Sequence, residues 1–510
     1  MARMTDYPDI IATICRIADA DPARPFLRNS AGELLLDYGR LRHETARIAG
    51  LLAQLGVRPG DRVTAQVEKS VPALLLYLGC HWHGAVYMPL NGGYTAAEVA
   101  WFIADAEPSL LVIDPAWLAK LADLPAGLRI ETLDGDGTGS WIDLLATAGD
   151  PELIPPAHDP EAPAAMLYTS GTTGKPKGAV IPRRALSSNA AILVDAWHFT
   201  RYDVLIHALP IFHVHGLFIA TNTLICAGGS LIFLPRFDAA QVHALFPQAT
   251  ALMGVPTFYT RLLTLRELNR KSTGHIRLFI SGSAPLLAET HRDFEERTGH
   301  AILERYGMTE TQMNTSNPYD GERVAGTVGF PLPGVDLRIT DPATGKDNAH
   351  GEIGMIEVRG PNLFSGYWRN PQKTAEDMRA DGFFITGDLG LIDEAGYVRI
   401  IGRGKDLIIS GGLNVYPKEI ESEIDDLPGV NESAVIGVPH PDLGEAVVAV
   451  IVPQAGATLD ETAIVAGLKD RLARFKQPKS VRFVPELPRN TMGKVQKNAL
   501  REEYKGLFQP

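Results

Sequence analysis

The segment from Tyr168 to Gly178 constrains this chain more than any other, because it holds three glycines, four aliphatic hydroxyl groups and two lysines within eleven residues. Glycine permits backbone conformations closed to other residues and lets backbone N–H groups approach a ligand. Hydroxyl and ammonium groups supply further donors to phosphate oxygens. The segment is not a Walker A loop, since Lys175 is followed by Pro176 and Thr169 stands five places before Gly174. It predicts a loop that binds a polyphosphate, with a plain surface loop as the alternative.

Length and net charge narrow the class of protein. With 510 residues the chain is too long for a single hydrophobic core, and its length suggests about three structural units. The formal charge of −12 argues against a general nucleic-acid surface or an anionic-membrane surface, because such a field repels both polyanions. Binding of a phosphate-bearing molecule must therefore depend on local clusters of basic residues.

Cysteine usage and the N-terminus indicate a compartment. The chain has three cysteines, Cys15, Cys80 and Cys226, and no C-x-x-C pair. This usage favours a reducing cytoplasm. Acidic residues in the first turns interrupt any apolar core of a signal peptide, so we expect a cytoplasmic protein.

One long segment, from Ile211 to Pro235, carries no formal charge. It contains His213, His215 and Asn222, which favours a buried strand and helix over a membrane span. The H-x-H pair is also a possible metal site, but no third ligand is suggested nearby, so we do not expect a metal there.

The order of helical and apolar segments predicts the fold class. Early in the chain a helical stretch such as Tyr38 to Leu55 alternates with short apolar runs such as Leu110 to Ile113, which is typical of a layered parallel sheet. The apolar run Leu278 to Ser281 and the helical periodicity of Tyr259 to Leu268 continue this pattern. After residue 326 short glycine-bounded strands predominate, which indicates a β-rich subdomain.

Four glycines and several charges surround a short apolar strand at residues 402–412, as expected of a hinge. A compact α+β unit of about a hundred residues follows. We therefore predict an N-terminal domain over residues 1–402, a hinge at 403–406 and a mobile C-terminal domain over 407–510.

Four further motifs follow the glycine-rich loop. They are Y-G-M-T-E at 306–310, T-G-D at 386–388, the basic pair Arg403 and Lys405, and P-R-N-T-M-G-K at 488–494. Each has an ordinary alternative: a capped helix start, a turn, or solvated basic side chains. In this order the five motifs resemble the adenylate-forming superfamily, which includes acyl-CoA synthetases, luciferases and the adenylation domains of peptide synthetases. The resemblance implies an α/β fold, with layered sheets and a β-rich subdomain in the large N-terminal domain and a small mobile α+β C-terminal domain.

The resemblance also implies a chemistry. A carboxylate resists attack by a thiol, and ATP solves this by converting one carboxylate oxygen into a bond to AMP. The implied cofactors and co-substrates are ATP, Mg²⁺ and coenzyme A, and the implied catalytic residues are Lys494, His213 and Glu310. Thr169 and Glu310 would hold the magnesium ion. The residues implied to bind the nucleotide are Thr169, Ser170, Gly171, Thr172, Thr173, Lys177, Tyr306, Gly307, Met308, Thr309, Asp388, Arg403 and Lys405.

Several longer phrases are most similar to those of malonyl-CoA synthetases, among them M-G-V-P-T-F-Y-T-R-L and L-F-I-S-G-S-A-P-L. In that family the residues at Arg261 and Ser283 receive the distal carboxylate of the acid, and the residue at His213 lies near the reacting carboxyl. A second carboxylate in a closed pocket must be paired, and a guanidinium offers two parallel donors. The alternative for Arg261 is an arginine on a helix surface.

The sequence thus favours an ATP-dependent malonate–CoA ligase with malonate, ATP and CoA as its small-molecule partners and with neither nucleic acid nor membrane. Three alternatives stay open. They are a ligase for another short acid such as methylmalonate, an enzyme that loads a carrier protein, and a non-catalytic sensor of nucleotide or CoA.

Overall fold

A computed structural model describes residues 7–121, 124–169, 176–410, 413–469, 471–490 and 493–508. By packing, the chain divides into two compact units. The first comprises residues 1–336 and 358–384, and the second comprises residues 337–357 and 385–510. The predicted hinge at 403–406 concerns motion rather than packing, so the predicted domain boundary stays a prediction.

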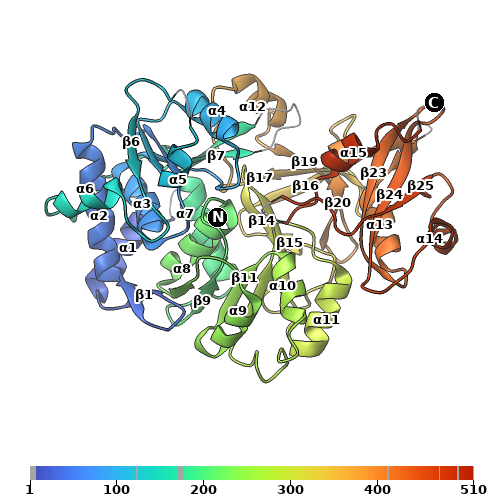
Figure 1. The fold of residues 1–510 in the computed structure, drawn as a ribbon, viewed down its shortest axis with the longest axis horizontal. Coiled ribbons are helices and arrows are strands. Elements are labelled where there is room, and N and C mark those ends of the chain that lie inside the picture. The colour runs from blue at the N-terminus through green and yellow to red at the C-terminus, as the bar shows by residue number, and fades with distance from the viewer. Residues whose placement is uncertain are drawn as a thin grey trace. The chain divides into compact units, whose positions relative to one another are not determined.

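Within the described residues, seven strands of the first unit form one sheet in the order β18-β8-β7-β4-β3-β5-β6. Figure 1 labels β6 and β7 of this sheet. Neighbours from β7 to β6 are parallel, whereas β8 runs antiparallel to both β7 and β18. The bounds are β3 Arg62–Gln66, β4 Val86–Pro89, β5 Leu110–Ile113, β6 Arg129–Thr132, β7 Pro163–Thr169, β8 Lys177–Pro182 and β18 Gly366–Tyr367.

A second sheet of the first unit has nine strands in the described part of the chain, in the order β15-β14-β13-β12-β11-β9-β10-β1-β2. Its central strands from β1 to β13 are parallel, and β2, β14 and β15 pair antiparallel at the edges. The bounds are β1 Pro25–Arg28, β2 Leu34–Asp37, β9 Val204–His207, β10 Ser230–Phe233, β11 Ala251–Gly254, β12 Leu278–Ser281, β13 Leu303–Met308, β14 Gln312–Ser316 and β15 Phe330–Pro331.

Helices connect the parallel strands, as a parallel sheet requires. Local caps explain several starts: Asp9 accepts from Ile11 N at the start of α1, and Thr95 and Glu98 form a capping box at α4. The helices of the first unit are α1 Ile10–Ala20, α2 Tyr38–Gln54, α3 Val71–His83, α4 Ala96–Ala106, α5 Pro115–Leu118, α6 Ser140–Thr147, α7 Arg183–Ala196, η1 His215–Ala220, α8 Thr221–Ala227, α9 Ala239–Leu245, η2 Phe246–Gln248, α10 Pro256–Leu263, α11 Ala288–Thr298 and α12 Pro371–Asp377.

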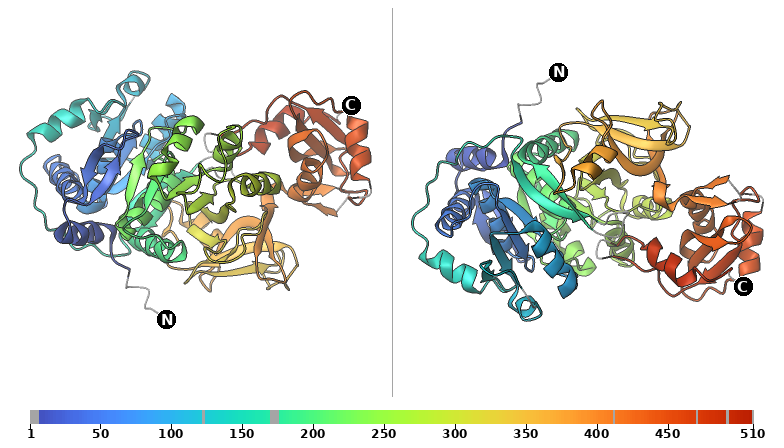
Figure 2. Two further views of the ribbon diagram at one scale, coloured as in Figure 1. Left: turned by 90° about the horizontal axis from the view of Figure 1, so that it is seen from below. Right: turned by 90° about the horizontal axis from the view of Figure 1, so that it is seen from above.

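The second unit holds two sheets and four helical segments in its described residues. Strands β23 and β24 form a long hairpin, with α13 and α14 packed on one face and α15 on the other (Figure 2). The bounds are β16 Asp336–Thr340, β17 Gly354–Arg359, β19 Phe384–Ile392, β20 Val398–Arg403, η3 Gly404–Asp406, β21 Ile408–Ser410, β22 Leu413–Val415, α13 Pro417–Asp425, β23 Val430–His440, β24 Gly444–Pro453, α14 Glu461–Leu468, β25 Ser480–Phe483 and α15 Lys497–Tyr504.

The predicted layered α/β fold is confirmed. The runs Leu110 to Ile113 and Leu278 to Ser281 are strands β5 and β12, and the stretch from Tyr38 is helix α2. The helical periodicity of Tyr259 to Leu268 is partly wrong, because α10 ends at Leu263. The reason is local: both the backbone N–H and the hydroxyl of Thr264 donate to the carbonyl of Arg261, a bond that competes with the helix.

The uncharged segment from Ile211 to Pro235 forms η1, α8 and β10, and most of its residues are buried. Among the described residues, no helix is both long enough and apolar enough to cross a membrane. The prediction of a buried strand and helix for this segment is confirmed.

Candidate functional site

The glycine-rich loop joins two paired strands. Strand β7 ends at Thr169 and β8 begins at Lys177, and these two residues face each other across the pair. Ser170, Gly171, Thr172 and Thr173 lie outside the described residues. The hairpin thus brings both ends of the loop to the carboxyl edge of a largely parallel sheet, which is where α/β folds bind ligands.

The Y-G-M-T-E motif lies on β13 and the turn that follows it, so the capped helix start considered for it is wrong. Tyr306, Gly307 and Met308 are strand residues, whereas Thr309 and Glu310 lie in the turn to β14. A side chain at Gly307 would collide with the backbone carbonyl of Gln312, which explains why glycine stands there. The tight hairpin places Glu310 beside the glycine-rich loop.

Glu310 and Thr169 meet although 141 residues separate them. The Thr169 hydroxyl donates to Oε1 of Glu310 over 3.1 Å, and the hydroxyl of Tyr367 donates to the same oxygen over 3.2 Å. Glu310 is only 5% exposed. A buried carboxylate beside a hydroxyl is a fitting ligand set for a magnesium ion that accompanies a triphosphate.

Lys177 lies next to this carboxylate. Its Nζ is 4.8 Å from the centre of the Tyr367 ring. Burial and the charge of Lys373 lower the pKa of Lys177, while Asp377 and Glu310 act in the opposite direction. The sequence analysis missed Tyr367 and Lys373, because β18 pairs with β8 over a long separation and no local pattern marks either residue.

A second cluster lies at the carboxyl ends of β9 and β12, in the nine-stranded sheet. Ser283 Oγ is 3.2 Å from Nδ1 of His215, and Ser283 has a positive φ of 72°. A non-glycine residue in that conformation is strained, which occurs often at functional sites. The backbone N–H of His215 donates to Nδ1 of His213 over 3.3 Å, which leaves the proton of a neutral His213 on Nε2.

Arg305 lies against the same cluster and was missed by the sequence analysis. Its side chain is 3% exposed, and a side chain at Gly282 would collide with its guanidinium. Burial lowers the pKa of Arg305. Burial, and then the charge of Arg305, lower the pKa of His213 to about 4 and that of His215 well below its ordinary value. Both imidazoles are therefore neutral at neutral pH.

The guanidinium of Arg305 has no ion-pair partner among the described residues, although the charge of Glu304 opposes the lowering of its pKa. Its Nε and one terminal nitrogen are buried without a hydrogen-bond partner, and no carboxylate of the described residues forms an ion pair with it. An arginine stays charged in proteins, so an unpaired buried guanidinium is costly unless a ligand supplies the anion. The cluster of Arg305, Ser283, His213 and His215 is hereafter the acid pocket.

Arg261, predicted to hold the distal carboxylate, is exposed on α10. Its backbone carbonyl accepts from Thr264, and its guanidinium forms no ion pair within the described residues. The structure therefore links Ser283 to His213 through His215 and leaves the role of Arg261 a prediction.

In the second unit, T-G-D and the hinge arginine are direct neighbours. Asp388 on β19 faces Arg403 on β20, and Nε of Arg403 is 2.6 Å from Oδ1 of Asp388. The backbone N–H of Asp388 donates to the hydroxyl of Thr386 over 3.0 Å. A buried aspartate with an adjacent arginine offers both acceptors and donors to the hydroxyls of a ribose.

Lys494 belongs to a tight loop of the second unit. The backbone N–H of Lys494 donates to Oδ1 of Asn490, and Asn490 N donates to the carbonyl of Lys494, each over 2.9 Å. Desolvation lowers the pKa of Lys494 to about 8, and the charges of Arg403 and Lys405 act in the same direction. The charges of Asp388 and Asp406 act on the same ammonium group in the opposite direction.

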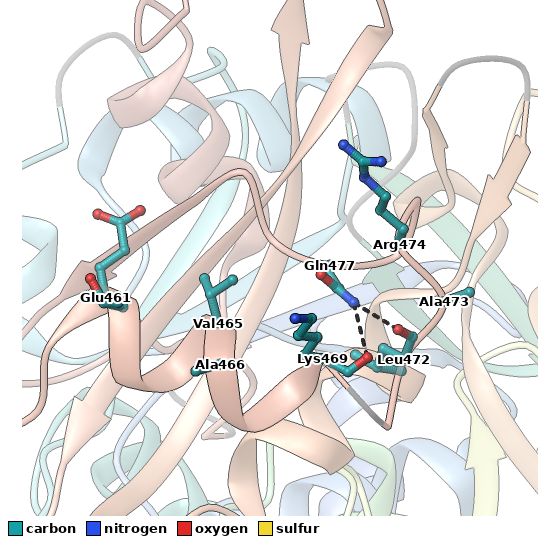
Figure 3. A pocket seen from close by; sticks show the side chains of 9 residues that line it. Glu461, Val465, Ala466, Lys469, Leu472, Ala473, Arg474 and Gln477 are labelled. Atoms are coloured by element: carbon teal, nitrogen blue, oxygen red, sulfur yellow. Dashed lines mark hydrogen bonds between the residues drawn. The ribbon is translucent and has the colours of Figure 1, made fainter.

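A surface pocket of about 820 Å³ lies beside α14 in the second unit (Figure 3). Glu461 and Val465 line it from the helix, and Lys469, Arg474 and Gln477 line it from the segment that follows the helix. Leu472 and Ala473 complete its apolar floor. None of the motif residues lines it. This pocket is therefore not part of the candidate active site.

The expectation that the H-x-H pair binds no metal stays a prediction. No group of three or more His, Cys, Asp or Glu side chains in the described residues is placed to hold a metal ion. His215 instead pairs with Ser283.

Comparison of the chain with known protein families identifies its family. The "AMP-binding enzyme" family matches residues 15–368, and the "AMP-binding enzyme C-terminal domain" family matches residues 419–494. This chain belongs to the AMP-binding enzyme family, the adenylate-forming superfamily that its motifs resemble.

Several individual proteins are similar to this chain over nearly its whole length. The crystal structure of ATP-bound MatB from Rhodopseudomonas palustris is 56% identical, covers 98% of this chain and 100% of its own, and has a TM-score of 0.93. The malonate–CoA ligase of Arabidopsis thaliana is 34% identical and covers 91% of this chain and 84% of its own. The indoleacetate–CoA ligase of Aromatoleum aromaticum is 35% identical and covers 96% of this chain and 97% of its own. Overall identity to the curated relatives therefore does not choose between acids.

Proposed function

We propose that the protein is an AMP-forming acid–CoA ligase whose acid is malonate. It converts malonate, ATP and CoA into malonyl-CoA, AMP and diphosphate through malonyl-AMP. Relatives at similar identity act on malonate and on indoleacetate, so the choice of acid rests on the acid pocket rather than on overall similarity.

The single observation that carries this proposal is the buried, unpaired guanidinium of Arg305. Malonate brings a second carboxylate that pairs with it, and an Arg–carboxylate pair is often bidentate. A monocarboxylate such as acetate leaves the charge buried and unpaired, which costs binding free energy. Ser283 and His215 are hydrogen-bonded to each other, and the charge of Arg305 acts on both His213 and His215.

In the first half of the proposed reaction, a carboxylate oxygen of malonate attacks the α-phosphorus of ATP, and the bond to pyrophosphate breaks. The protonated Nε2 of His213 donates to the reacting carboxyl group. Lys494, by the role of its family counterpart, neutralises charge where the carboxylate meets the α-phosphate. Magnesium belongs to the proposal: the Thr169 hydroxyl and the Glu310 carboxylate would hold it, and it would neutralise charge on the phosphates.

In the second half, the sulfur of CoA attacks the carbonyl carbon of malonyl-AMP, the bond to AMP breaks, and the thiol proton is released. Lys494 serves only the first half in this proposal. The predicted hinge at residues 403–406 would let the C-terminal domain exchange the Lys494 loop for a surface that admits CoA.

The proposal also includes the cellular compartment of the protein, which we take to be the cytoplasm. All three cysteines are free thiols, which supports a reducing compartment such as the cytoplasm.

The test is a product balance with the purified protein. With malonate, ATP, Mg²⁺ and CoA, we expect malonyl-CoA, AMP and diphosphate in equimolar amounts, and AMP and diphosphate formation to require malonate. ADP as a product, or nucleotide binding without turnover of any carboxylic acid, contradicts a ligase. Transfer to a carrier protein but not to CoA would instead establish the carrier-loading alternative.

A further inference from the structure

A lysine outside the family motifs makes contacts that the proposed reaction does not explain. Lys69 follows β3, and its Nζ lies 2.8 Å from both Nδ1 and the carbonyl oxygen of His207. The same nitrogen is 4.4 Å from the centre of the Phe233 ring. No carboxylate of the described residues forms an ion pair with Lys69. Burial lowers the pKa of Lys69 well below its ordinary value.

The hydrogen bonds of His207 have a fixed direction. This residue ends β9 and has no exposed surface, and its Nε2 lies 2.9 Å from the carbonyl oxygen of Gly216. A carbonyl only accepts, so Nε2 must carry a proton. Burial and the charge of Lys69 lower the pKa of His207 to about 3, so the ring is neutral and Nδ1 is an acceptor. Lys69 is the donor that this acceptor requires.

Gly216 connects this chain of hydrogen bonds to the acid pocket. It lies in η1, a single π-helical turn that begins at His215, and its carbonyl also accepts from the Thr221 hydroxyl over 3.0 Å. A side chain at Gly216 would collide with the carbonyl of Pro210, so the backbone here is closely packed. Such π-turns occur often at functional sites.

A purely structural explanation is that Lys69 links the seven-stranded sheet to the nine-stranded sheet by its hydrogen bonds to His207. A methionine would fill that space without a buried charge. A hydrogen-bond donor at Nδ1, however, fixes the tautomer of His207, which a methionine cannot do. Without that donor, the proton of the ring can move from Nε2 to Nδ1. In that tautomer Nε2 and the Gly216 carbonyl are both acceptors and repel each other.

We propose that Lys69 is a positioning residue of the acid pocket. Its donation to Nδ1 keeps His207 protonated on Nε2, His207 then holds the Gly216 carbonyl, and this bond fixes the backbone that carries His213 and His215. The inference depends on the proposed function only for the identity of the acid.

The first experiment reads the tautomer directly. Full-length protein labelled with ¹⁵N-histidine gives distinct nitrogen shifts for the two tautomers, and His207→Gln assigns the signal. In the wild type we expect His207 protonated on Nε2. In Lys69→Met we expect a mixed or reversed tautomer, and in Lys69→Arg, which retains donors, the wild-type tautomer.

The second experiment is kinetic. We expect Lys69→Met to raise KM for malonate about tenfold or more, as loss of a charge-assisted hydrogen bond allows, with KM for ATP within about twofold of wild type and Lys69→Arg closer to wild type. Lys120→Met is the matched control, because Lys120 stacks on the Trp117 ring at 4.4 Å on the surface. It should change neither KM.

Two results would overturn the inference. One is an unchanged tautomer with an unchanged KM for malonate in Lys69→Met. The other is an equal loss for malonate, ATP and CoA together with a lower melting temperature, which would mark a purely structural lysine. If the wild type instead uses a different acid, the proposed function fails, but the tautomer and the KM for that acid still test Lys69.

Discussion

A guanidinium buried without a carboxylate lowers the stability of a folded chain, and Arg305 is such a group in the part of the protein that the structure describes. Its side chain lies against Gly282, and Glu304, whose charge raises the pKa of Arg305, forms no ion pair with it. The missing anion is best supplied by the substrate. This is why we assign the choice of acid to Arg305, in addition to the predicted Arg261.

The substitution Arg305→Met tests this assignment. Loss of a charge-assisted hydrogen-bonded pair should lower kcat/KM for malonate by about 10- to 100-fold. Because the variant also removes a buried unpaired charge, its melting temperature should be equal to or higher than that of the wild type. Steady-state kinetics and thermal unfolding measure the two effects.

Arg261→Ala is the companion variant, since Arg261 is exposed and its guanidinium has no ion pair within the described chain. If Arg261 contributes more than Arg305 to binding the distal carboxylate, Arg261→Ala will lose more malonate activity than Arg305→Met. If neither substitution changes malonate kinetics, the acid pocket is misassigned.

Lys494 gives a prediction about pH. Its pKa is lowered to about 8, mainly by desolvation. The protonated form is the one that neutralises phosphate charge, so adenylation should fall as pH rises through about 8, well before an ordinary lysine would lose its proton. Thioester formation from supplied malonyl-AMP should show no such decline. Pyrophosphate release measured between pH 6 and 10 checks this, and a flat profile would contradict it.

At the scale of elements, the π-turn η1 and its flanking strand position the histidines. Gly216 is closely packed against the Pro210 carbonyl, whereas Gly50 in α2 has no atom near the place of a side chain. Gly216→Ala should therefore cost about 1–3 kcal/mol of unfolding free energy through overpacking. Gly50→Ala should instead stabilise by about 0.5–1 kcal/mol, because alanine favours a helix.

Thermal or denaturant unfolding of both variants checks this pair. Equal effects at the two positions would show that Gly216 is not tightly packed.

How far the sequence predicts these elements depends on the range of the interactions. Strands β5 and β12 follow from four-residue apolar runs, because central parallel strands are buried on both faces. The motif residues Glu310 and Asp388 were found because local order marks them. Tyr367 and Arg305 were missed because their neighbours come from distant segments: Tyr367 meets Glu310 across 57 residues. The end of α10 was misplaced because the hydroxyl of Thr264 competes with the helix.

At the scale of the whole molecule, the central question is how one enzyme performs two half-reactions. Lys494→Ala should abolish most malonate-dependent pyrophosphate release, because it removes the charge that the proposal places at the α-phosphate. Conversion of supplied malonyl-AMP and CoA to malonyl-CoA should continue. Rapid-quench measurement of each half-reaction tests this, and equal loss of both would refute separate roles for the hinge-linked domain.

The most direct test of the account is a specificity series. Pyrophosphate release is measured at saturating ATP with acetate, propionate, malonate, methylmalonate and succinate, for the wild type and for Arg305→Met. We predict that the wild type prefers malonate to acetate by about 100-fold or more in kcat/KM, the value of one buried charge-assisted pair, and that Arg305→Met loses most of this preference. A wild type that uses acetate or a longer monocarboxylate as well as malonate would contradict the account.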